Sequence, residues 1–258
     1  MTWYQAILLF AAAVLGGTLN SVAGGGTFIT LPTLIFTGVP SVNANVTSTV
    51  ALWPGTLATI GGYRGTLHVE RRLLLILGGV SIVGGALGAL VLLHTTQTLF
   101  LHLVPYLLLL ATLLFAFGGT ITSRLRPRKN DADGQSGPFR LSLGWVVTLQ
   151  FVIALYGGFF GGGIGILMLA ALSAMGMDDI HSANALKAIL NACINGVAIV
   201  TFIIAGAVFW GQAIVMILGA IAGGYGGARV ARRLDPKLVR RFVILVGIVM
   251  SIYFFVRK

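Results

Sequence analysis

Apolar stretches alternate with short polar connections along the whole chain. In the first half the stretches cover residues 5–23, 27–39, 43–63, 73–93 and 98–117. In the second half they cover residues 141–156, 164–175, 183–205, 213–230 and 238–256. Continuous apolar runs are typical of membrane-spanning helices, whereas a transmembrane barrel would show short alternating segments. The pattern therefore predicts an all-α integral membrane protein.

Glycine-rich breaks interrupt both halves of the chain at corresponding places. The glycines at positions 24–26 and those at positions 161–163 lie 137 residues apart (161 − 24). Glycine lets the backbone take unusual conformations and approach other groups closely. Irregular backbone at membrane depth is tolerated only where protein or a water-filled cavity covers it. The duplication predicts two copies of one unit, each broken at the same place.

The stretch that follows the first break, residues 27–39, is shorter than the roughly 20 residues that a full helical span needs. Each broken pair is therefore either a re-entrant helical hairpin with the glycines at its tip or two tilted crossings, and we favour the hairpin. Each half then contains the hairpin plus about three full spans, or five crossings. The glycines later in the first half, at positions 78, 79, 84, 85 and 88, are expected to serve tight helix packing.

Composition supports the membrane assignment, since 57% of the residues are hydrophobic and only 9% are charged. A soluble domain carries about a quarter charged residues. The net charge of +11 follows from loop cations rather than from a nucleic-acid partner, because cytoplasmic loops collect Lys and Arg. Most of the cations lie in three connections: Arg64, Arg71 and Arg72; Arg124, Arg126, Arg128, Lys129 and Arg140; and Arg229, Arg232, Arg233, Lys237, Arg240 and Arg241.

If these three connections are cytoplasmic, each half crosses the membrane an odd number of times. Both the three-span scheme and the five-crossing scheme meet this condition. The halves are then inverted relative to each other, as in inverted-repeat transporters. We expect an N-terminal repeat over residues 1–121, a basic cytoplasmic linker over 122–140 and a C-terminal repeat over 141–258. Such a multi-pass protein would lie in the plasma (cytoplasmic) membrane with both termini on the outer side.

Polar residues in the stretch 183–205 follow one helix face. Asn184, Lys187, Asn191 and Asn195 lie at positions i, i+3, i+7 and i+11. Lys187 is the one ionisable residue that we place well inside a span, where a charge is costly and normally faces a cavity or a partner. Either an anionic substrate supplies that partner, or the lysine lies close to the interface and extends its ammonium group to it.

Asn45, Thr47 and Ser48 are the corresponding polar residues of the first half. They either donate to an anion beside the free amides of a helix N-terminus or form hydrogen bonds between helices. Asn20 and Thr27 flank the first break. The predicted substrate-binding residues are Asn20, Gly24, Gly25, Gly26, Thr27, Asn45, Thr47, Ser48, Gly161, Gly162, Gly163, Asn184, Lys187, Asn191 and Asn195.

At these positions the sequence resembles the TauE/SafE family, the sulfite and sulfonate exporter group of membrane proteins. The resemblance rests on the two glycine runs together with Pro32, Gly38-Val39-Pro40, Ala44, Thr47-Ser48, Gly176, Ala183-Asn184 and Lys187. It implies export of small sulfur-containing anions such as sulfoacetate, other sulfonates or sulfite, or transport of another organic anion. Leu186-Lys187 stands in place of Thr47-Ser48, so the two half-sites are not chemically equivalent.

The leading prediction is a secondary transporter that works by alternating access on a small anionic substrate in a lipid bilayer. No Walker A motif, no clustered metal ligands and no nucleophile–base pair stand in the sequence, so we expect no enzyme activity, catalytic residue, metal or cofactor. A membrane-embedded enzyme is the second class considered. A non-transporting membrane assembly factor is the third.

Overall fold

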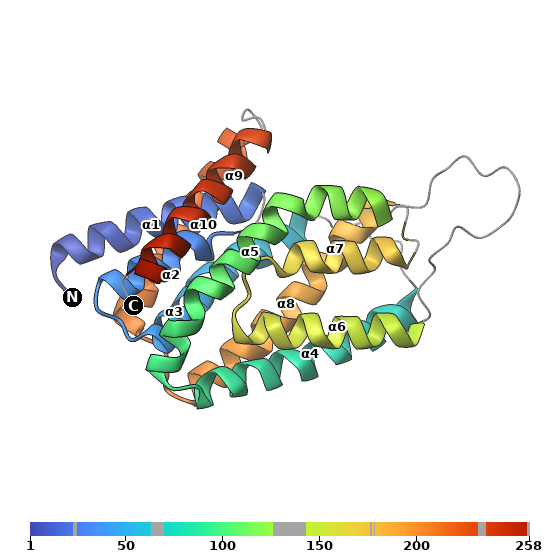
Figure 1. Cartoon of the computed structure of the whole chain (residues 1–258), viewed down its shortest axis with the longest axis horizontal. Helices are drawn as coiled ribbons and strands as arrows, with labels where there is room; N and C mark the ends of the chain where they lie inside the picture. Colours follow the sequence, from blue (N-terminus) through green and yellow to red (C-terminus); the bar gives the residue numbers. More distant parts are fainter. Residues whose placement is uncertain are drawn as a thin grey trace, which may run out of the picture.

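A computed structural model describes residues 1–22, 25–62, 70–125, 143–175, 177, 179–231 and 236–256. This described part of the chain contains ten α-helices and no strand (Figure 1). The first half contains α1 (Trp3–Val22), α2 (Thr27–Phe36), α3 (Ser41–Gly62), α4 (Arg71–His94) and α5 (Gln97–Leu125). The second half contains α6 (Leu143–Phe159), α7 (Ile164–Ala174), α8 (Ile180–Ile204), α9 (Trp210–Ala231) and α10 (Pro236–Val256). The predicted all-α architecture is confirmed, whereas most of the predicted linker lies outside the described residues.

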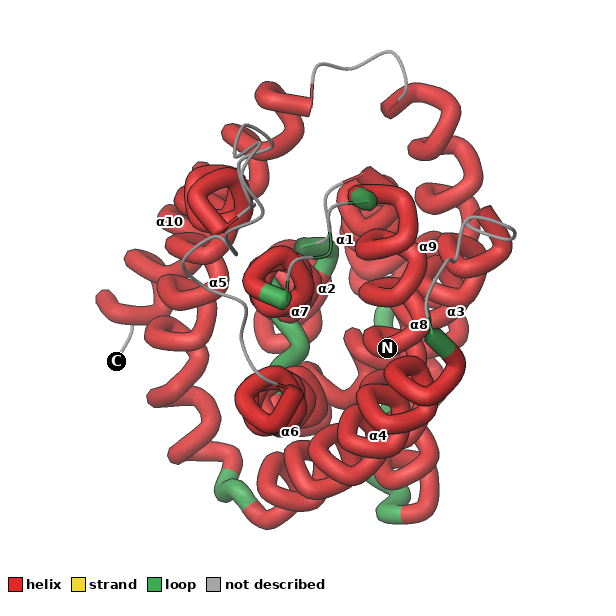
Figure 2. The backbone as a smooth tube through the Cα atoms, turned by 90° about the vertical axis from the view of Figure 1, so that its right-hand side faces the viewer, coloured by secondary structure: helices red, strands yellow, loops and turns green. Residues whose placement is uncertain are grey.

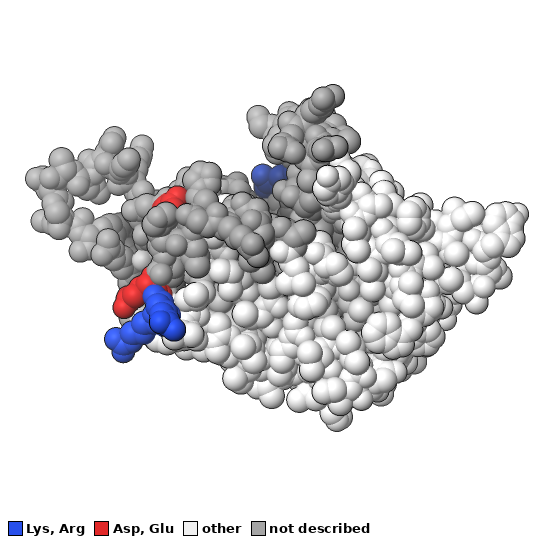
Figure 3. All heavy atoms as spheres, turned by 180° about the vertical axis from the view of Figure 1, so that it is seen from behind, with Lys and Arg blue, Asp and Glu red and all other residues white. Residues whose placement is uncertain are grey.

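The length and the apolar surface of the helices are those of a membrane protein. Among the described residues, four helices are long and apolar enough to cross a bilayer, namely α1, α4, α5 and α8. Large apolar side chains such as Leu75, Val83 and Leu218 are exposed on the outside of the bundle. Figure 3 shows the described charged residues of one face gathered toward one end and the adjoining edge, while the rest of the described surface is uncharged. The chain is a multi-pass membrane protein.

The first broken pair is a helical hairpin. A methyl group on Gly26, at the start of α2, would lie 2.5 Å from the carbonyl oxygen of Gly16 in α1. Beyond the end of α2, the carbonyl of Thr37 accepts a hydrogen bond of 3.2 Å from the side chain of Gln5, near the start of α1. The 10-residue helix α2 therefore runs back along the 20-residue helix α1. At about 1.5 Å per residue, α2 is only about 15 Å long.

Contacts between the halves occur in matched pairs. Helix α1 packs along α9, and its counterpart α6 packs along α4. Likewise α3 packs on α9 while α8 packs on α4, and α5 packs on its own counterpart α10. The neighbours α1–α9, α4–α6 and α5–α10 can be followed in Figure 2. Each half thus completes the helix packing of the other.

Glycines bring the α1 and α9 backbones into direct contact. A methyl group on Gly17 would lie 2.3 Å from the carbonyl oxygen of Ala220. A methyl group on Gly223 would lie 1.9 Å from that of Val14. Small residues at helix interfaces permit this approach in membranes, where van der Waals packing rather than the hydrophobic effect joins helices.

The α4–α6 pair is built in the same way. A methyl group on Gly88 would lie 2.1 Å from the carbonyl oxygen of Leu155, and one on Gly84 would lie 2.7 Å from the Cβ of Ala154. The packing interpretation is wrong for Gly78 and Gly79, because nothing in the described part of the chain lies within 4 Å of a methyl group at either position.

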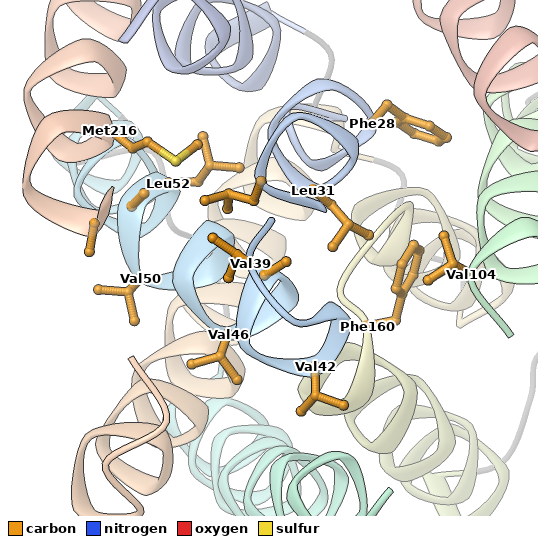
Figure 4. Close-up of a cluster of buried hydrophobic side chains, with 14 of the residues drawn as sticks. Phe28, Leu31, Val39, Val42, Val46, Val50, Leu52, Val104, Phe160 and Met216 are labelled. Atoms are coloured by element: carbon orange, nitrogen blue, oxygen red, sulfur yellow. The ribbon is translucent and has the colours of Figure 1, made fainter. Parts of the chain in front are cut away.

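The largest buried cluster surrounds α2 and α3 at the centre of the molecule. Figure 4 shows Phe28 and Leu31 on α2, Val46 on the neighbouring helix α3, and Phe160 beside Val104 of α5. All five side chains are buried, and the cluster also includes residues of α1, α4, α8, α9 and α10. The short helix α2 is therefore held by apolar packing on several sides.

Polar contacts join the start of α3 to connections from both halves. The amide of Asn43 donates to the carbonyl of Ala207 at 2.8 Å and accepts from the Gln97 side chain at 3.0 Å. Gln97 in turn accepts from the backbone N–H of Val42 at 2.7 Å. The beginnings of α3 and α5 and the α8–α9 connection therefore share one end of the molecule. Both chain ends also lie at this side, opposite the start of α4 and the end of α5 (Figure 1).

The glycine contact predicts a difference between two positions of α4. Gly88→Ala should lower the free energy of unfolding by about 1–3 kcal/mol, because the methyl group overpacks the α6 backbone. Gly79→Ala, in open space on the same helix, should instead raise it by up to about 1 kcal/mol through helix propensity. Thermal unfolding of both variants in detergent measures the two effects. Equal effects of the two substitutions would contradict the packing role of Gly88.

Candidate functional site

A cavity of about 400 Å³ lies between the two broken helix pairs. It is bounded by both hairpin tips, the middle of α3, the end of α5 and the first half of α8. The residues that line it are Asn20, Gly25, Thr27, Thr49, Leu52, Trp53, Gly55, Thr56, Phe115, Phe160, Gly161, Gly162, Gly163, Ile164, Gly165, Ile166, Leu169, Asn184, Lys187, Ala188, Asn191 and Asn195. Residues from both halves therefore meet in one space.

Lys187 crosses the first turn of α7 within this cavity. Its Cδ lies 3.5 Å from the position that a Cβ on Gly165 would take, so the lysine stem packs against the first turn of α7 at van der Waals distance. Its ammonium group donates one hydrogen bond of 3.0 Å to Oδ1 of Asn184. Since an ammonium group has three donors, further donors are available to a ligand.

The glycine break before α7 shapes the start of that helix. Gly161 and Gly163 have φ values of +82° and +79°, a left-handed conformation that only glycine takes at little cost. The Tyr156 hydroxyl donates to the carbonyl of Gly162 at 2.8 Å and so fixes the loop against α6. The N–H groups of the first turn of a helix have no intrahelical partner and form its positive end. This end of α7 lies at the cavity beside Lys187.

The predicted polar face of α8 lines the cavity along its length. Besides Asn184 and Lys187, it includes Asn191 and Asn195. The Asn195 amide donates to the Oδ1 of Asn191 at 2.7 Å and to its carbonyl oxygen at 3.0 Å. These contacts orient the two amides relative to each other. The structure thus brings all four residues of the sequence pattern to one surface.

The first hairpin tip contributes Asn20, Gly25 and Thr27 to the cavity. Oδ1 of Asn20 accepts a hydrogen bond of 3.2 Å from the backbone N–H of Gly26, which itself is buried against α1 rather than on the cavity surface. Gly24 lies outside the described residues. The amide at the start of α2 is therefore paired, and at the start of α7 the N–H of Ile166 donates to the carbonyl of Gly163 at 3.1 Å.

The other three candidates of the first half do not line the cavity. The Asn45 amide donates to the carbonyl of Phe159 at 3.0 Å, and the Thr47 hydroxyl accepts from the N–H of Phe209 at 3.2 Å. Ser48 shares a hydrogen bond of 2.6 Å with Thr30, and these three candidates are all buried. In this conformation they serve contacts between helices.

Sequence reasoning missed the contribution of α3. Thr49 and Thr56 lie seven positions apart on the cavity face, with Leu52 and Trp53 between them at helical spacing. That periodicity was the available signal. The indole Nε1 of Trp53 is buried and has no hydrogen-bond partner among the described residues. Phe115 and the apolar residues of α7 carry no comparable signal, because they resemble any core residue.

The lining restricts the chemistry that this site can perform. Lys187 is its one charged side chain, and no carboxylate is among the described residues that line it. The described residues also contain no group of three or more His, Cys, Asp or Glu side chains able to hold a metal ion. The site offers a cation, amides, hydroxyls and a helix N-terminus, which are groups that bind anions.

An all-helical, multi-pass architecture with two broken helix pairs around a polar cavity defines a membrane transport protein. The chain belongs to the TauE/SafE family, since the family model described as "Sulfite exporter TauE/SafE" matches residues 9–254. It is 28% identical over 254 residues to a probable membrane transporter protein, ORF9, of Sinorhizobium, covering 98% of this chain and 93% of that protein.

Two further relatives carry similar names. The probable membrane transporter protein YfcA of Escherichia coli K12 is 28% identical over 250 residues, covering 95% of this chain and 87% of that protein. The probable membrane transporter protein YunE of Bacillus subtilis is 24% identical over 262 residues, covering 93% and 95% of the two chains. No solved structure matches this chain.

The backbone conformation and the close neighbours of Gly25 predict that a substitution there lowers transport as well as stability. Gly25 has φ +94°, and a methyl group there would lie 3.1–3.2 Å from side-chain atoms of Val243, Phe115 and Phe28. Gly25→Ala should therefore cost about 1–2 kcal/mol of stability for the left-handed conformation and also displace Phe115 at the cavity. Transport activity in proteoliposomes should fall several-fold.

Gly38→Ala is the matched control for the tip. Gly38 has a similar φ of +88°, but nothing lies within 4 Å of a methyl group there. This variant should lose a similar amount of stability while retaining flux. Full flux in Gly25→Ala would show that the tip tolerates a side chain.

Proposed function

We propose that this chain is a secondary transporter that moves a small organic anion, such as a sulfonate, through the membrane by alternating access. The observation that carries the proposal is the position of Lys187 across the first turn of α7, in a cavity that no described carboxylate lines. A cation and the positive end of a helix converge there without a negative partner.

Electrostatics favour an anion at this position. An ionisable side chain within a span normally faces a partner or a water-filled cavity. The partial positive charge at a helix N-terminus adds to that of the ammonium group, and both are screened less inside the protein than at its surface. A bound anion would balance both, and the side-chain amide of Asn191 could supply a neutral donor.

The family description supports a sulfur oxyanion as the charged group. The matching family model is described as a sulfite exporter. A sulfonate or sulfite group presents three oxygens, which suits several donors arranged around one point. Lys187, the start of α7, and Thr49 and Thr56 of α3 line the cavity and offer donors for such a group. Export rather than uptake is the direction that the family description favours.

The matched contacts between halves support an inverted repeat. Helix α1 packs on α9 as α6 packs on α4, which is the pattern of two copies related by a two-fold axis. Arg72 and Arg241 are exposed near the starts of α4 and α10, at the ends away from the chain termini. We infer that residues 1–121 and 141–258 are inverted repeats in the plasma membrane, with the basic linker 122–140 inside and both termini outside.

Alternating access follows from a difference between the two repeats. Asn45 and Asn184 correspond at an offset of 139 residues (184 − 45), as do Ser48 and Lys187. The first-half pair is closed against Phe159 and Thr30, whereas the second-half pair lines the cavity. An exchange of these two conformations between the repeats would open the opposite side and expose Asn45, Thr47 and Ser48 to the substrate.

Membrane topology tests the inverted repeat. In a Cys193→Ala background, which removes the single cysteine, Thr96→Cys should react with an impermeant maleimide from outside the cell. Asn130→Cys should react only after the membrane is opened, because the proposed linker is cytoplasmic. Labelling of position 130 in intact cells, or protection of position 96 there, would contradict the inverted scheme.

Binding to Lys187 tests the anion site itself. Lys187→Met should weaken sulfoacetate binding about ten- to a hundredfold, because a hydrogen bond to a charged group contributes about 1.5–3 kcal/mol. Lys187→Arg should restore part of the affinity, since the charge returns but the planar guanidinium is larger. Calorimetry in detergent measures binding, and sulfoacetate flux in proteoliposomes measures transport.

Arg72→Met provides the matched control, since it removes a cation that is exposed at the start of α4 and does not line the cavity. This variant should bind sulfoacetate like the parent. If Lys187→Met also binds sulfoacetate as tightly as the parent protein, the anion site lies elsewhere. Absence of flux for every sulfonate, carboxylate and sulfite tested would contradict the transporter proposal as a whole.

A further inference from the structure

The cavity lining is divided between a polar and an apolar side. Helix α8 contributes its stripe of polar residues and a single alanine, Ala188. Helices α5 and α7 contribute only glycine and apolar side chains, among them Phe115, Ile166 and Leu169. The ammonium group of Lys187 therefore faces a space whose other side offers no hydrogen bond from side chains. An ion with oxygens on all sides would leave that apolar side unused.

The volume of the cavity also favours a ligand larger than an inorganic oxyanion. It measures about 400 Å³, whereas a water molecule takes about 30 Å³ in the liquid and a four-atom ion such as sulfite at most about four times that. An inorganic oxyanion beside Lys187 would leave most of the space to water. Ligand sites are usually filled mainly by apolar contacts, with a few polar groups that set orientation.

Trp53 lies where the polar and apolar sides meet. Its Cζ2 is 3.4 Å from the position that a Cβ on Gly196 would take, so the ring packs over α8 next to Asn195. Its Nε1 donor is buried without a partner among the described residues. A buried donor without a partner is uncommon in native proteins and calls for an explanation. The ring itself supplies an apolar surface to the cavity, on which a carbon chain could pack.

We infer that the preferred substrate is a singly charged organic anion with an apolar body of several carbon atoms, and that Trp53 and the apolar side of the cavity determine this preference. The inference rests on the proposed anion transport and adds the chemistry of the uncharged part. A single negative charge matches the one charged side chain of the lining. The anionic group lies at Lys187, and the carbon chain extends between Trp53 and Leu169.

A series of unbranched alkanesulfonates tests the inference on the full-length protein. Calorimetry in nanodiscs compares sulfite with methane-, propane-, butane- and hexanesulfonate, using an uncharged dialkyl sulfone to measure partition into the lipid. Affinity should rise about threefold to fourfold for each methylene group until the chain fills the cavity, because each buried group leaves water. Sulfite should bind more weakly than every member from propanesulfonate upward.

Substitutions at two positions test where the carbon chain lies. Leu169→Asn should reduce the gain per methylene group, so that hexanesulfonate loses about tenfold more affinity than methanesulfonate, and Leu169→Met should retain the gain. Trp53→Ala removes the apolar ring and should also reduce the gain per methylene group, whereas Trp53→Phe keeps an aromatic ring and should retain most of it.

Affinity that does not change with chain length, while still depending on Lys187, would overturn this inference and leave the proposed anion transport standing. A gain per methylene group that Leu169→Asn does not change would overturn the placement of the carbon chain. Failure of all sulfonates to bind, in the parent and in Lys187→Met alike, would instead overturn the proposed function.

Discussion

Close backbone contact between helices of different halves is the constraint on which the rest of this structure depends. Where α1 meets α9 and where α4 meets α6, glycines leave no room for even a methyl group. In a bilayer such contacts contribute through dispersion and interhelical polar contacts, since lipid is as apolar as the helices. Because α1 and α6 carry the broken pairs, these two contacts also set where both glycine tips lie, and hence where the cavity forms.

The backbone amides at the two glycine breaks need hydrogen-bond partners, and this need shapes the candidate site. Every helix end inside a membrane has amides without intrahelical partners, and each needs a partner from protein, water or ligand. At the first tip, Asn20 supplies that partner to Gly26. At the second tip, the start of α7 faces the cavity beside Lys187, so the partner proposed there is the substrate. The same structural need is thus met by a side chain in one half. In the other half the carbonyl of Gly163 pairs with the N–H of Ile166, and the substrate is the proposed partner of the remaining first-turn amides.

Local periodicity made the helices and the polar face of α8 predictable, because spacing along one helix decides which side chains share a face. Features that depend on partners distant in sequence were less accessible. Gly79 and Gly88 look alike in sequence, yet only Gly88 meets another backbone. Asn45 and Asn184 also look alike, but one is bonded to Phe159 and the other lines the cavity. That difference depends on the conformation of the whole protein, which a local sequence pattern does not reveal. The sequence favours the hairpin over two crossings, but only the contacts of Gly26 and Thr37 with α1 show that α2 runs antiparallel to α1.

A duplicated transporter does not need a duplicated charge. The two repeats must exchange shapes for alternating access, and their shapes depend on glycine tips and helix packing that both halves share. Lys187 lies on α8, which contacts both α3 and α4 near the centre of the molecule. A second lysine in place of Ser48 would be buried beside Thr30 in the present state, without an anion to balance it. Burial of an unpaired charge costs far more than burial of a hydroxyl that has a partner. Burial therefore explains why a hydroxyl stands at position 48, in the half-site that is closed in this structure, while the lysine of the pair lines the cavity.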